Sequence, residues 1–412
     1  MNHDSRLRLT NTLTGNKEAL ETREEGMVRV FTCGPSIYRR PHLGNYRSFI
    51  YEDLLEKHLE YLGWTVARCL NFTDVEDKAV NEAREKGVSL MDLTRPVEER
   101  FRRECGLLNI RLPREIPRSS TSVDTAVRII RKLLDTGRAY RHGEDVYFDP
   151  TTFEGFGSVY GLDMSTWPKQ RVRFGRDTYP GRRWNLGDFA LWRGWRPEDG
   201  EAYWDTELGK GRPSWNVQDP AMIVEELGCE VDIATGGVDN LWRHHDYNRA
   251  IMESYCGKDY AHTWLHGEHL LAAGRKMSKS LGNILYPEHL LDKGHSPAAV
   301  RHYLMKEHYR RPQDFNRAAF EAESDALVEL QQECATLCKG LDNDEPEPSQ
   351  AGRELQEVYE SAMNDDLQSG AALERLGAKV KELNARGLGD VERLAAKAAL
   401  ERIDRVLGVL LV

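Results

Sequence analysis

A strand, an amphipathic helix and a second strand follow one another between residues 27 and 72. Residues 27–32 form a short β-branched run that predicts a buried strand. From Tyr46 onwards apolar residues recur at helical spacing, and Gly63 stands where such a helix would end. Residues 64–72 then predict the second strand. A unit of this kind packs as parallel strands with a right-handed crossover, and its ligands bind beyond the carboxyl ends of the strands.

The composition and the hydrophobic pattern change several times along the rest of the chain. Residues 80–140 have a helical pattern, whereas residues 140–213 are rich in Gly, Trp and Arg and contain only short strand-like pieces. Strand-like sequence returns near residue 231, and from residue 312 the pattern is helical to the end. We therefore expect an α/β domain divided by an insertion and followed by a helical region, as the length of 412 residues also suggests.

Composition excludes several classes of protein. A hydrophobic content of 40% excludes a disordered chain, and no apolar run approaches the ~18 residues that span a bilayer. The first residues lack the apolar stretch of a secretory signal, so we expect a cytoplasmic protein without a membrane partner. The net charge of −10 is weak evidence against a surface devoted to nucleic acid.

The seven cysteines are scattered and odd in number, which predicts no disulfide framework. Cys334 and Cys338 lie four residues apart on an expected helix, and we interpret them as packing residues. A cysteine with a function would then be a metal ligand or a free thiol.

The segment from Pro41 to Asn45 lies between the first strand and the helix. A helix N-terminus offers unpaired N–H groups and a partial positive charge, which suit a phosphate. Gly44 allows a ligand to approach the backbone, while His42 and Asn45 supply side-chain donors one turn apart. Taken alone the segment is a weak signal, because a His and a Gly at a helix start are usually structural.

A second short segment, far along the chain, carries two lysines three residues apart. Lys276 and Lys279 belong to the string Lys-Met-Ser-Lys-Ser and are flanked by Gly274 and Gly282. A cationic loop of this kind suits a polyphosphate. Its occurrence together with the first segment favours a nucleotide site over an ordinary solvated loop.

The two segments resemble the paired signatures of class I aminoacyl-tRNA synthetases, and other strings narrow the resemblance to cysteinyl-tRNA synthetases. The resemblance extends from about residue 22 to residue 315 and includes these strings: residues 31–35, 71–78, 188–192, 236–239 and the pair His244-His245. It implies an α/β fold with a Rossmann-like catalytic domain interrupted by an insertion, followed by a C-terminal α-helical bundle. The implied divisions are residues 22–120 and 214–285 for the two catalytic halves, 121–213 for the insertion, 286–316 for a connection and 317–412 for the bundle.

The resemblance also implies the reaction. An amino-acid carboxylate attacks the α-phosphorus of ATP, and catalysis consists mainly of positioning and charge neutralisation with Mg²⁺. His42, Asn45, Lys276 and Lys279 correspond to the family's catalytic positions. The nucleotide-binding positions correspond to His42, Gly44, Asn45, Trp264, His266, Lys276, Met277, Ser278 and Lys279, although Trp264 and His266 alone would be interpreted as core residues. The amino-acid pocket corresponds to Cys33, Gly34, Thr73, Trp215 and Asp239, and Asp239 could pair with the α-ammonium group.

The metal site departs from the family pattern. In the family two Cys, one His and one Glu hold a zinc ion that binds the substrate thiolate. Cys33 and His244 match, but Asp219 replaces the second Cys and Asn248 replaces the Glu. Three alternatives remain open: a metal bound with weaker affinity, a pocket rebuilt without metal, or a neighbour such as His245 or Asp246 as a new ligand.

The acceptor of the activated amino acid is also open. The residues after Ser280 suffice for a helical bundle but leave little room for the family's anticodon-binding region. Tryptophans and arginines between residues 171 and 196 could hold RNA or form the core of the insertion. The expected partners are an amino acid and either tRNA or a small amine or carrier protein; the oligomeric state is open. The alternatives are a true cysteine-tRNA ligase, a biosynthetic ligase, and a non-catalytic paralogue that binds nucleotide or RNA.

Overall fold

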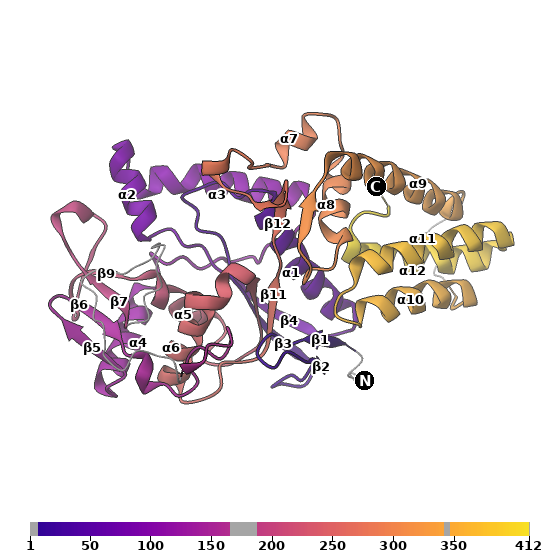
Figure 1. Ribbon diagram of the computed structural model, residues 1–412. Helices are drawn as coiled ribbons and strands as arrows, with labels where there is room; N and C mark the ends of the chain where they lie inside the picture. The colour runs from indigo at the N-terminus through magenta and orange to yellow at the C-terminus, as the bar shows by residue number, and fades with distance from the viewer. Residues whose placement is uncertain (1–6, 165–187, 342–346, 412) are drawn as a thin grey trace.

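A four-stranded parallel sheet forms the centre of the computed structural model, which describes residues 7–164, 188–341 and 347–411 (Figure 1). Its strand order is β11-β10-β3-β4, and its members are β3 (Met27–Thr32), β4 (Thr65–Leu70), β10 (Val231–Gly237) and β11 (Ala261–Gly267). Thr32 pairs with Leu70 on one side and with Thr235 on the other. The loops that follow β3, β10 and β11 therefore meet at one edge of the sheet, as parallel strands require.

Helices cover both faces of this sheet because its strands alternate their side chains between two cores. Val30 and Leu265 pack on the face that is covered by α1 (Leu43–Tyr61). Phe31 and Trp264 pack on the opposite face, together with residues of α5 (Trp215–Glu226) and α6 (Asp246–Cys256). The predicted unit of strand, helix and strand is thus confirmed as β3, α1 and β4.

The region between the two halves of the sheet contains helices and a second, antiparallel sheet. The helices are α2 (Asp77–Lys86), α3 (Leu90–Leu107) and α4 (Val123–Asp135). The sheet has the order β5-β6-β7-β9-β8, with β5 (Ala139–His142), β6 (Asp145–Phe148), β7 (Phe189–Gly194), β8 (Trp204–Thr206) and β9 (Gly209–Pro213). Trp192 of this sheet packs with Val217 of α5 and Ile251 of α6, so both helices are shared between two cores. Most of the predicted run of Arg and Trp lies outside the described residues.

The remaining elements connect the sheet to a helical bundle at the other end of the molecule (Figure 1). The hairpin β1 (Arg8–Thr10) and β2 (Lys17–Ala19) precedes the sheet. A small sheet consists of β12 (Leu270–Ala272), β13 (Arg275–Lys276) and β14 (Gln313–Phe315). In the sequence, α7 (Glu288–Leu291) and α8 (Pro297–Lys306) lie between β13 and β14. The bundle consists of α9 (Arg317–Cys338), α10 (Gln350–Met363), α11 (Ser369–Arg386) and α12 (Asp390–Leu407). Within the described ranges, every helix is too short or too polar to cross a bilayer.

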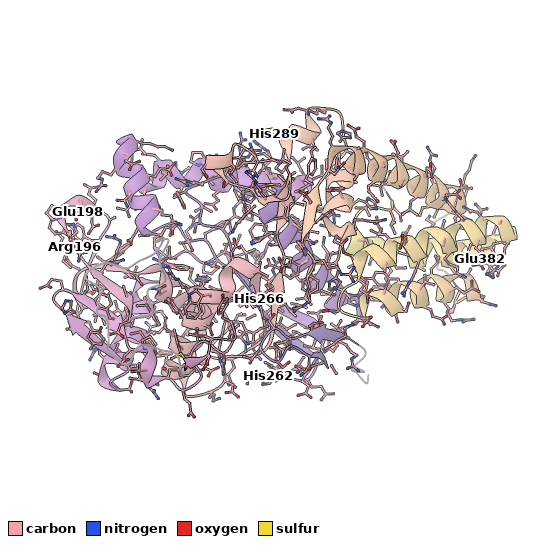
Figure 2. The ribbon with its side chains drawn as sticks, viewed as in Figure 1. Arg196, Glu198, His262, His266, His289 and Glu382 are labelled. Atoms are coloured by element: carbon pink, nitrogen blue, oxygen red, sulfur yellow. A yellow bond between two sulfur atoms is a disulfide. The ribbon has the colours of Figure 1, made fainter. Side chains whose placement is uncertain are left out.

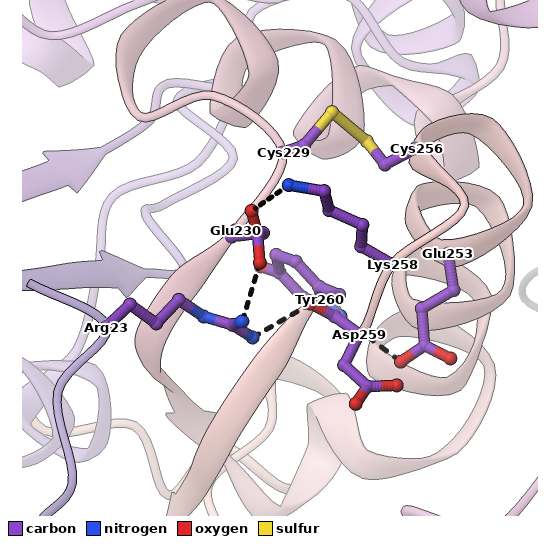
Figure 3. Close-up of a disulfide and its surroundings, with 8 residues drawn as sticks. All are labelled: Arg23, Cys229, Glu230, Glu253, Cys256, Lys258, Asp259 and Tyr260. Carbon is purple, nitrogen blue, oxygen red and sulfur yellow. Dashed lines mark hydrogen bonds and ion pairs between the residues drawn. A yellow bond between two sulfur atoms is a disulfide. The ribbon is translucent and has the colours of Figure 1, made fainter.

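A disulfide joins Cys229 to Cys256, so the expectation that no cysteines pair was wrong for these two (Figure 3). Their Cα atoms are 5.8 Å apart. Cys229 precedes β10 and Cys256 precedes β11, and the pairing of Val231 with Ala261 brings the two approaches to these strands together. Sequence spacing could not reveal this contact, because it depends on strand pairing. Cys334 is a free, buried thiol, consistent with its interpretation as a packing residue.

Candidate active site

A cavity of about 790 Å³ opens where the loops after β3, β10 and β11 meet the N-terminus of α1. Most of the predicted site residues line it: Cys33, Gly34, His42, Gly44, Asn45, Trp215, Asp239, His244, Lys276, Met277 and Ser278. Thr73, Trp264, His266, Asp219 and Asn248 lie outside its wall. The fold therefore brings the two short sequence segments, separated by most of the catalytic region, to one cavity.

His42 and Gly44 form the start of α1 at the cavity. His42 is the N-cap residue, and its backbone N–H donates to Oδ1 of Asn45 at 2.9 Å. The ring Nδ1 of His42 is buried and has no hydrogen-bond partner among the described residues. A Cβ at Gly44 would lie 3.0 Å from this ring, so glycine leaves the space that the imidazole occupies. Burial and the nearby charge of Lys276 lower the pKa of His42, which favours a neutral ring.

The lysine-bearing segment is held by its apolar and amide residues. Met277 is buried in the main core. Asn283 accepts a hydrogen bond from the Ser278 N–H at 2.9 Å and donates to the Lys276 carbonyl at 3.2 Å. These contacts fix the backbone, while the Lys276 side chain remains 55% exposed. Lys279 begins the short 3-10 turn over residues 279–281, and its side chain lies outside the described part of the structure.

Asp239 lines the cavity, and both of its carboxylate oxygens have partners. Oδ2 pairs with Nζ of Lys276, and Oδ1 accepts from Nε2 of His269 at 2.8 Å. Burial alone would raise the pKa of Asp239, but the His269 hydrogen bond and the Lys276 charge outweigh it and lower the pKa to about 2. The sequence predicted an α-ammonium partner for Asp239; in this structure a lysine of the chain itself occupies that carboxylate.

Trp264 and His266 belong to β11 and are buried. Figure 2 labels His266 near the middle of the molecule. Nε2 of His266 is 2.8 Å from Nδ1 of His245, and its Nδ1 is 2.9 Å from the Thr12 hydroxyl. Burial, with a smaller effect from Arg310, lowers the pKa of His266 to about 3, so the ring is neutral. The structure places both side chains in the core, and their assignment to nucleotide binding therefore rests on the resemblance alone.

Three potential ligand atoms converge at the amino-acid end of the cavity. Nε2 of His244 is 3.3 Å from Sγ of Cys33 and 2.8 Å from Oδ2 of Asp219, and the Cys33 sulfur is 3.8 Å from the same carboxylate oxygen. Trp215 stacks on the His244 ring, with centroids 4.5 Å apart. One sulfur, one nitrogen and one oxygen facing a common point are a donor set that zinc accepts, with a fourth position open.

The thiol of Cys33 is protonated in the absence of a metal. Burial raises the pKa of Cys33 well above its ordinary value, and the adjacent Asp219 carboxylate raises it further. The side-chain amide of Asn240 donates to the sulfur at 3.0 Å and favours a thiolate, but this contact is the weaker effect. A bound cation would reverse the balance, because a coordinating thiol is deprotonated.

Two side-chain amide groups donate hydrogen bonds to the Asp219 carboxylate. Asn71 donates to Oδ1 at 2.9 Å, and Asn248 donates to Oδ2 at 3.4 Å. The side-chain oxygen of Asn248 is buried without a hydrogen-bond partner among the described residues. Gly34 lies against the backbone of Asn71, because a Cβ there would lie 1.7 Å from the Asn71 backbone carbonyl oxygen, and its N–H donates to Asn71 Oδ1 at 2.9 Å.

The neighbours that the sequence offered as alternative ligands differ in their suitability. His245 offers a ring nitrogen within 4.8 Å of the donors of Cys33 and His244. The two oxygens of Asp246 instead accept from the backbone N–H groups of Val159 and Tyr160, at 3.0 and 3.2 Å. Asp246 therefore points away from Cys33 and cannot act as a ligand in this conformation, which corrects that alternative.

Comparison with known proteins gives a consistent result. A family model described as the class I (C) tRNA synthetase catalytic domain matches residues 19–325. Relatives named cysteine--tRNA ligase include one from Chlamydia pneumoniae, 36% identical over 93% of this chain and 82% of the relative, and one from Brachyspira hyodysenteriae, 33% identical over 97% and 85%.

The chain belongs to the cysteine-type class I tRNA synthetases.

Solved structures agree with this family at the level of the fold. A methionyl-tRNA synthetase from Mycobacterium tuberculosis, in complex with methionyl-adenylate, superposes with a TM-score of 0.64 at 15% identity, over 93% of this chain and 90% of that one. The agnB2 LeuRS of Agrobacterium radiobacter K84, in a ternary complex with tRNA and LeuAMS, gives 0.63 at 13% identity, over 95% and 84%. The predicted fold class is thereby confirmed, and this synthetase is a ligase that activates amino acids.

Three residues of the synthetase's site escaped sequence reasoning. Asn71 orients Asp219, Asn240 contacts the Cys33 sulfur, and His269 binds Asp239. Each follows the carboxyl end of a strand in the parallel sheet, where side chains converge. That position was the available signal, but position alone does not select one polar residue from its neighbours.

Proposed function

We propose that this synthetase activates cysteine as an aminoacyl adenylate and transfers it to tRNA, with a zinc ion held by Cys33, Asp219 and His244. The carrying observation is that one cavity is lined both by the phosphate-type residues His42 and Lys276 and by Cys33 and His244, and that the Asp219 carboxylate contacts His244 from behind the cavity wall. The first group suits a nucleotide and the second suits a soft side chain such as a thiol. The names of the relatives support cysteine and tRNA as substrates.

The chemistry expected at this cavity requires no protein nucleophile. The cysteine carboxylate oxygen forms a bond to the α-phosphorus of ATP, and the bond from that phosphorus to the bridging oxygen breaks as pyrophosphate leaves. His42 and the N-terminus of α1 bind phosphate oxygens, and Lys276 neutralises charge on the leaving group together with Mg²⁺. The thiol of Cys33 and the carboxylate of Asp219 do not react.

The residues at the amino-acid end fit a zinc ion with three protein ligands. Three ligands and an open position are typical of sites where zinc binds a substrate atom. Zinc at this point would lower the pKa of the substrate thiol and so favour cysteine over serine. Asn248, whose side-chain oxygen has no partner in the described part of the chain, adds a neutral polar group beside the three ligands.

Transfer to tRNA is the part of the proposal that depends most on the relatives. This chain covers 82% of the Chlamydia pneumoniae relative, which is named for its tRNA substrate. The proposed division comprises two catalytic halves (22–120 and 214–285), an insertion (121–213), a connection (286–316) and a bundle (317–412).

The test is exchange of labelled pyrophosphate into ATP, measured with each common amino acid, with and without added zinc. We expect the fastest exchange with cysteine and loss of that exchange after chelation. Exchange with a different amino acid contradicts the substrate, and absence of exchange with every amino acid contradicts the enzyme. Exchange without acylation of total tRNA contradicts the acceptor.

Lys276→Ala provides the site-specific control for this test. We expect exchange to fall by about 10²–10³-fold, because one preorganised charge at a developing oxyanion contributes on that scale. Arg275→Ala removes the neighbouring exposed cation on the same short strand and should change exchange less than about twofold. Equal effects of the two substitutions would refute a specific role for Lys276.

A further inference from the structure

Asp239 binds two cationic or donor side chains that both face the nucleotide end of the cavity. Nζ of Lys276 forms an ion pair with Oδ2, and Nε2 of His269 donates to Oδ1 at 2.8 Å. Lys276 approaches from β13, and His269 approaches from the loop between β11 and β12. Because Leu271 of β12 pairs with Lys276 of β13, the hairpin of these two strands brings both side chains to the same carboxylate.

The same two side chains lie beside the residue that begins α1. His42 lines the cavity with them; burial lowers its pKa, Lys276 and His269 add to this effect, and Asp239 opposes it. Three groups that can donate to phosphate oxygens are thus gathered around one carboxylate. A triphosphate entering this end of the cavity meets donors that Asp239 already occupies.

Release of these donors requires little rearrangement. The side chains of Asp239, Lys276 and His269 are 47%, 55% and 32% exposed, and ion pairs this accessible to water are weak. Met277 and Asn283 hold the backbone near Lys276, so Lys276 can leave Asp239 by rotation of its flexible side chain alone. A phosphate, with more charge than a carboxylate, competes effectively for both donors.

We propose that Asp239 holds Lys276 and His269 in reserve and that the phosphates of MgATP take both from it, which makes His269 a further phosphate-binding residue of this synthetase. In the nucleotide-bound state Nε2–H of His269 donates to a phosphate oxygen beside His42. The carboxylate of Asp239 is then free for another cation. This inference rests on the proposed nucleotide site.

The experiment is calorimetric titration of magnesium pyrophosphate into the full chain and its variants. We expect Asp239→Asn to tighten pyrophosphate binding about fivefold, because the donors lose their competitor, and His269→Gln to weaken it about fivefold. In the background His269→Gln/Lys276→Met, the gain from Asp239→Asn should fall below about twofold. Melting temperatures of the variants check that each remains folded, as expected for partly exposed side chains.

Glu268→Gln is the matched control for charge alone. Glu268 lines the same cavity next to His269, and its substitution removes one negative charge without releasing Lys276. We expect it to change pyrophosphate affinity less than about twofold. An equal gain from Asp239→Asn in both backgrounds, or no loss with His269→Gln, would overturn the proposal.

The outcomes separate this inference from the proposed function. If pyrophosphate exchange fails with every amino acid but the gain in pyrophosphate affinity from Asp239→Asn still depends on His269 and Lys276, only the proposed function is contradicted. If exchange succeeds but Asp239→Asn gives the same gain with and without His269 and Lys276, only the proposed role of His269 and Asp239 is contradicted.

Discussion

Asp219 is the residue that most distinguishes the amino-acid end of this site. Its carboxylate receives hydrogen bonds from Asn71 and Asn248 in addition to its contact with His244. These amides stabilise the carboxylate in a buried position that would otherwise be costly for a charge. The donor set therefore combines a hard carboxylate oxygen with the soft sulfur of Cys33.

Restoring the family ligands tests whether the geometry of the site is retained. The pair of substitutions Asp219→Cys and Asn248→Glu supplies a second thiolate and a second anion, and we expect zinc affinity to rise at least about tenfold. Competition with a chromophoric chelator measures this. Adding Cys33→Ser to the pair should remove the gain. Unchanged zinc affinity in the restored variant would show that the surrounding backbone no longer accommodates tetrahedral ligation.

At the scale of elements, α5 and α6 position the site because each belongs to two cores. α5 carries Asp219 and α6 carries Asn248, and both helices pack on the parallel sheet and on the inserted sheet. The disulfide joins the end of α6 to the segment between α5 and β10 (Figure 3). Beside it, Glu230 pairs with Arg23 and with Lys258, at 2.7 and 2.8 Å.

The disulfide should contribute measurably to stability. Cys229 and Cys256 are 27 residues apart, and a bridge closing such a loop contributes about 3.5 kcal/mol by restricting the unfolded chain. Guanidinium unfolding with and without dithiothreitol should show this difference for the natural chain and for Cys338→Ser. The variant Cys229→Ser cannot form the bond, so its free energy of unfolding should equal that of the reduced natural chain both with and without dithiothreitol. A natural chain whose unfolding is independent of reductant would contradict the bond.

At the scale of the whole molecule, one buried arginine joins the helical bundle to the layer over the sheet. Arg301 of α8 donates to the carbonyl of Leu407 at the end of α12, at 2.7 Å, and to the carbonyl of Leu108, at 3.0 Å. It also pairs with Asp53 of α1 at 2.7 Å, and both side chains are at most 1% exposed. The bundle is therefore connected to α1, the helix whose N-cap residue is His42.

Removal of this arginine should destabilise the molecule strongly. Arg301→Met leaves buried carbonyls and the Asp53 carboxylate without this partner, and we expect a loss of about 3–5 kcal/mol in the free energy of unfolding. Arg317→Met breaks the exposed pair with Glu321 on α9, and should cost less than about 0.5 kcal/mol. Chemical denaturation compares the two variants. Similar costs would show that Arg301 does not anchor the bundle.

The sequence by itself determined the central unit of β3, α1 and β4, the helical C-terminal region and the family, because local periodicity and short motifs are properties of neighbouring residues. It also identified Cys33, His42, His244 and Lys276 as residues of one site, through strings that occur together. Only the tertiary structure decided which side chains contact one another across the sheet edge. The Cys229–Cys256 bond, the occupation of Asp239 by Lys276 and His269, and the orientation of Asp246 away from Cys33 all arise where separate loops meet. Such contacts depend on strand order and register, which bring together residues that no spacing in the chain connects.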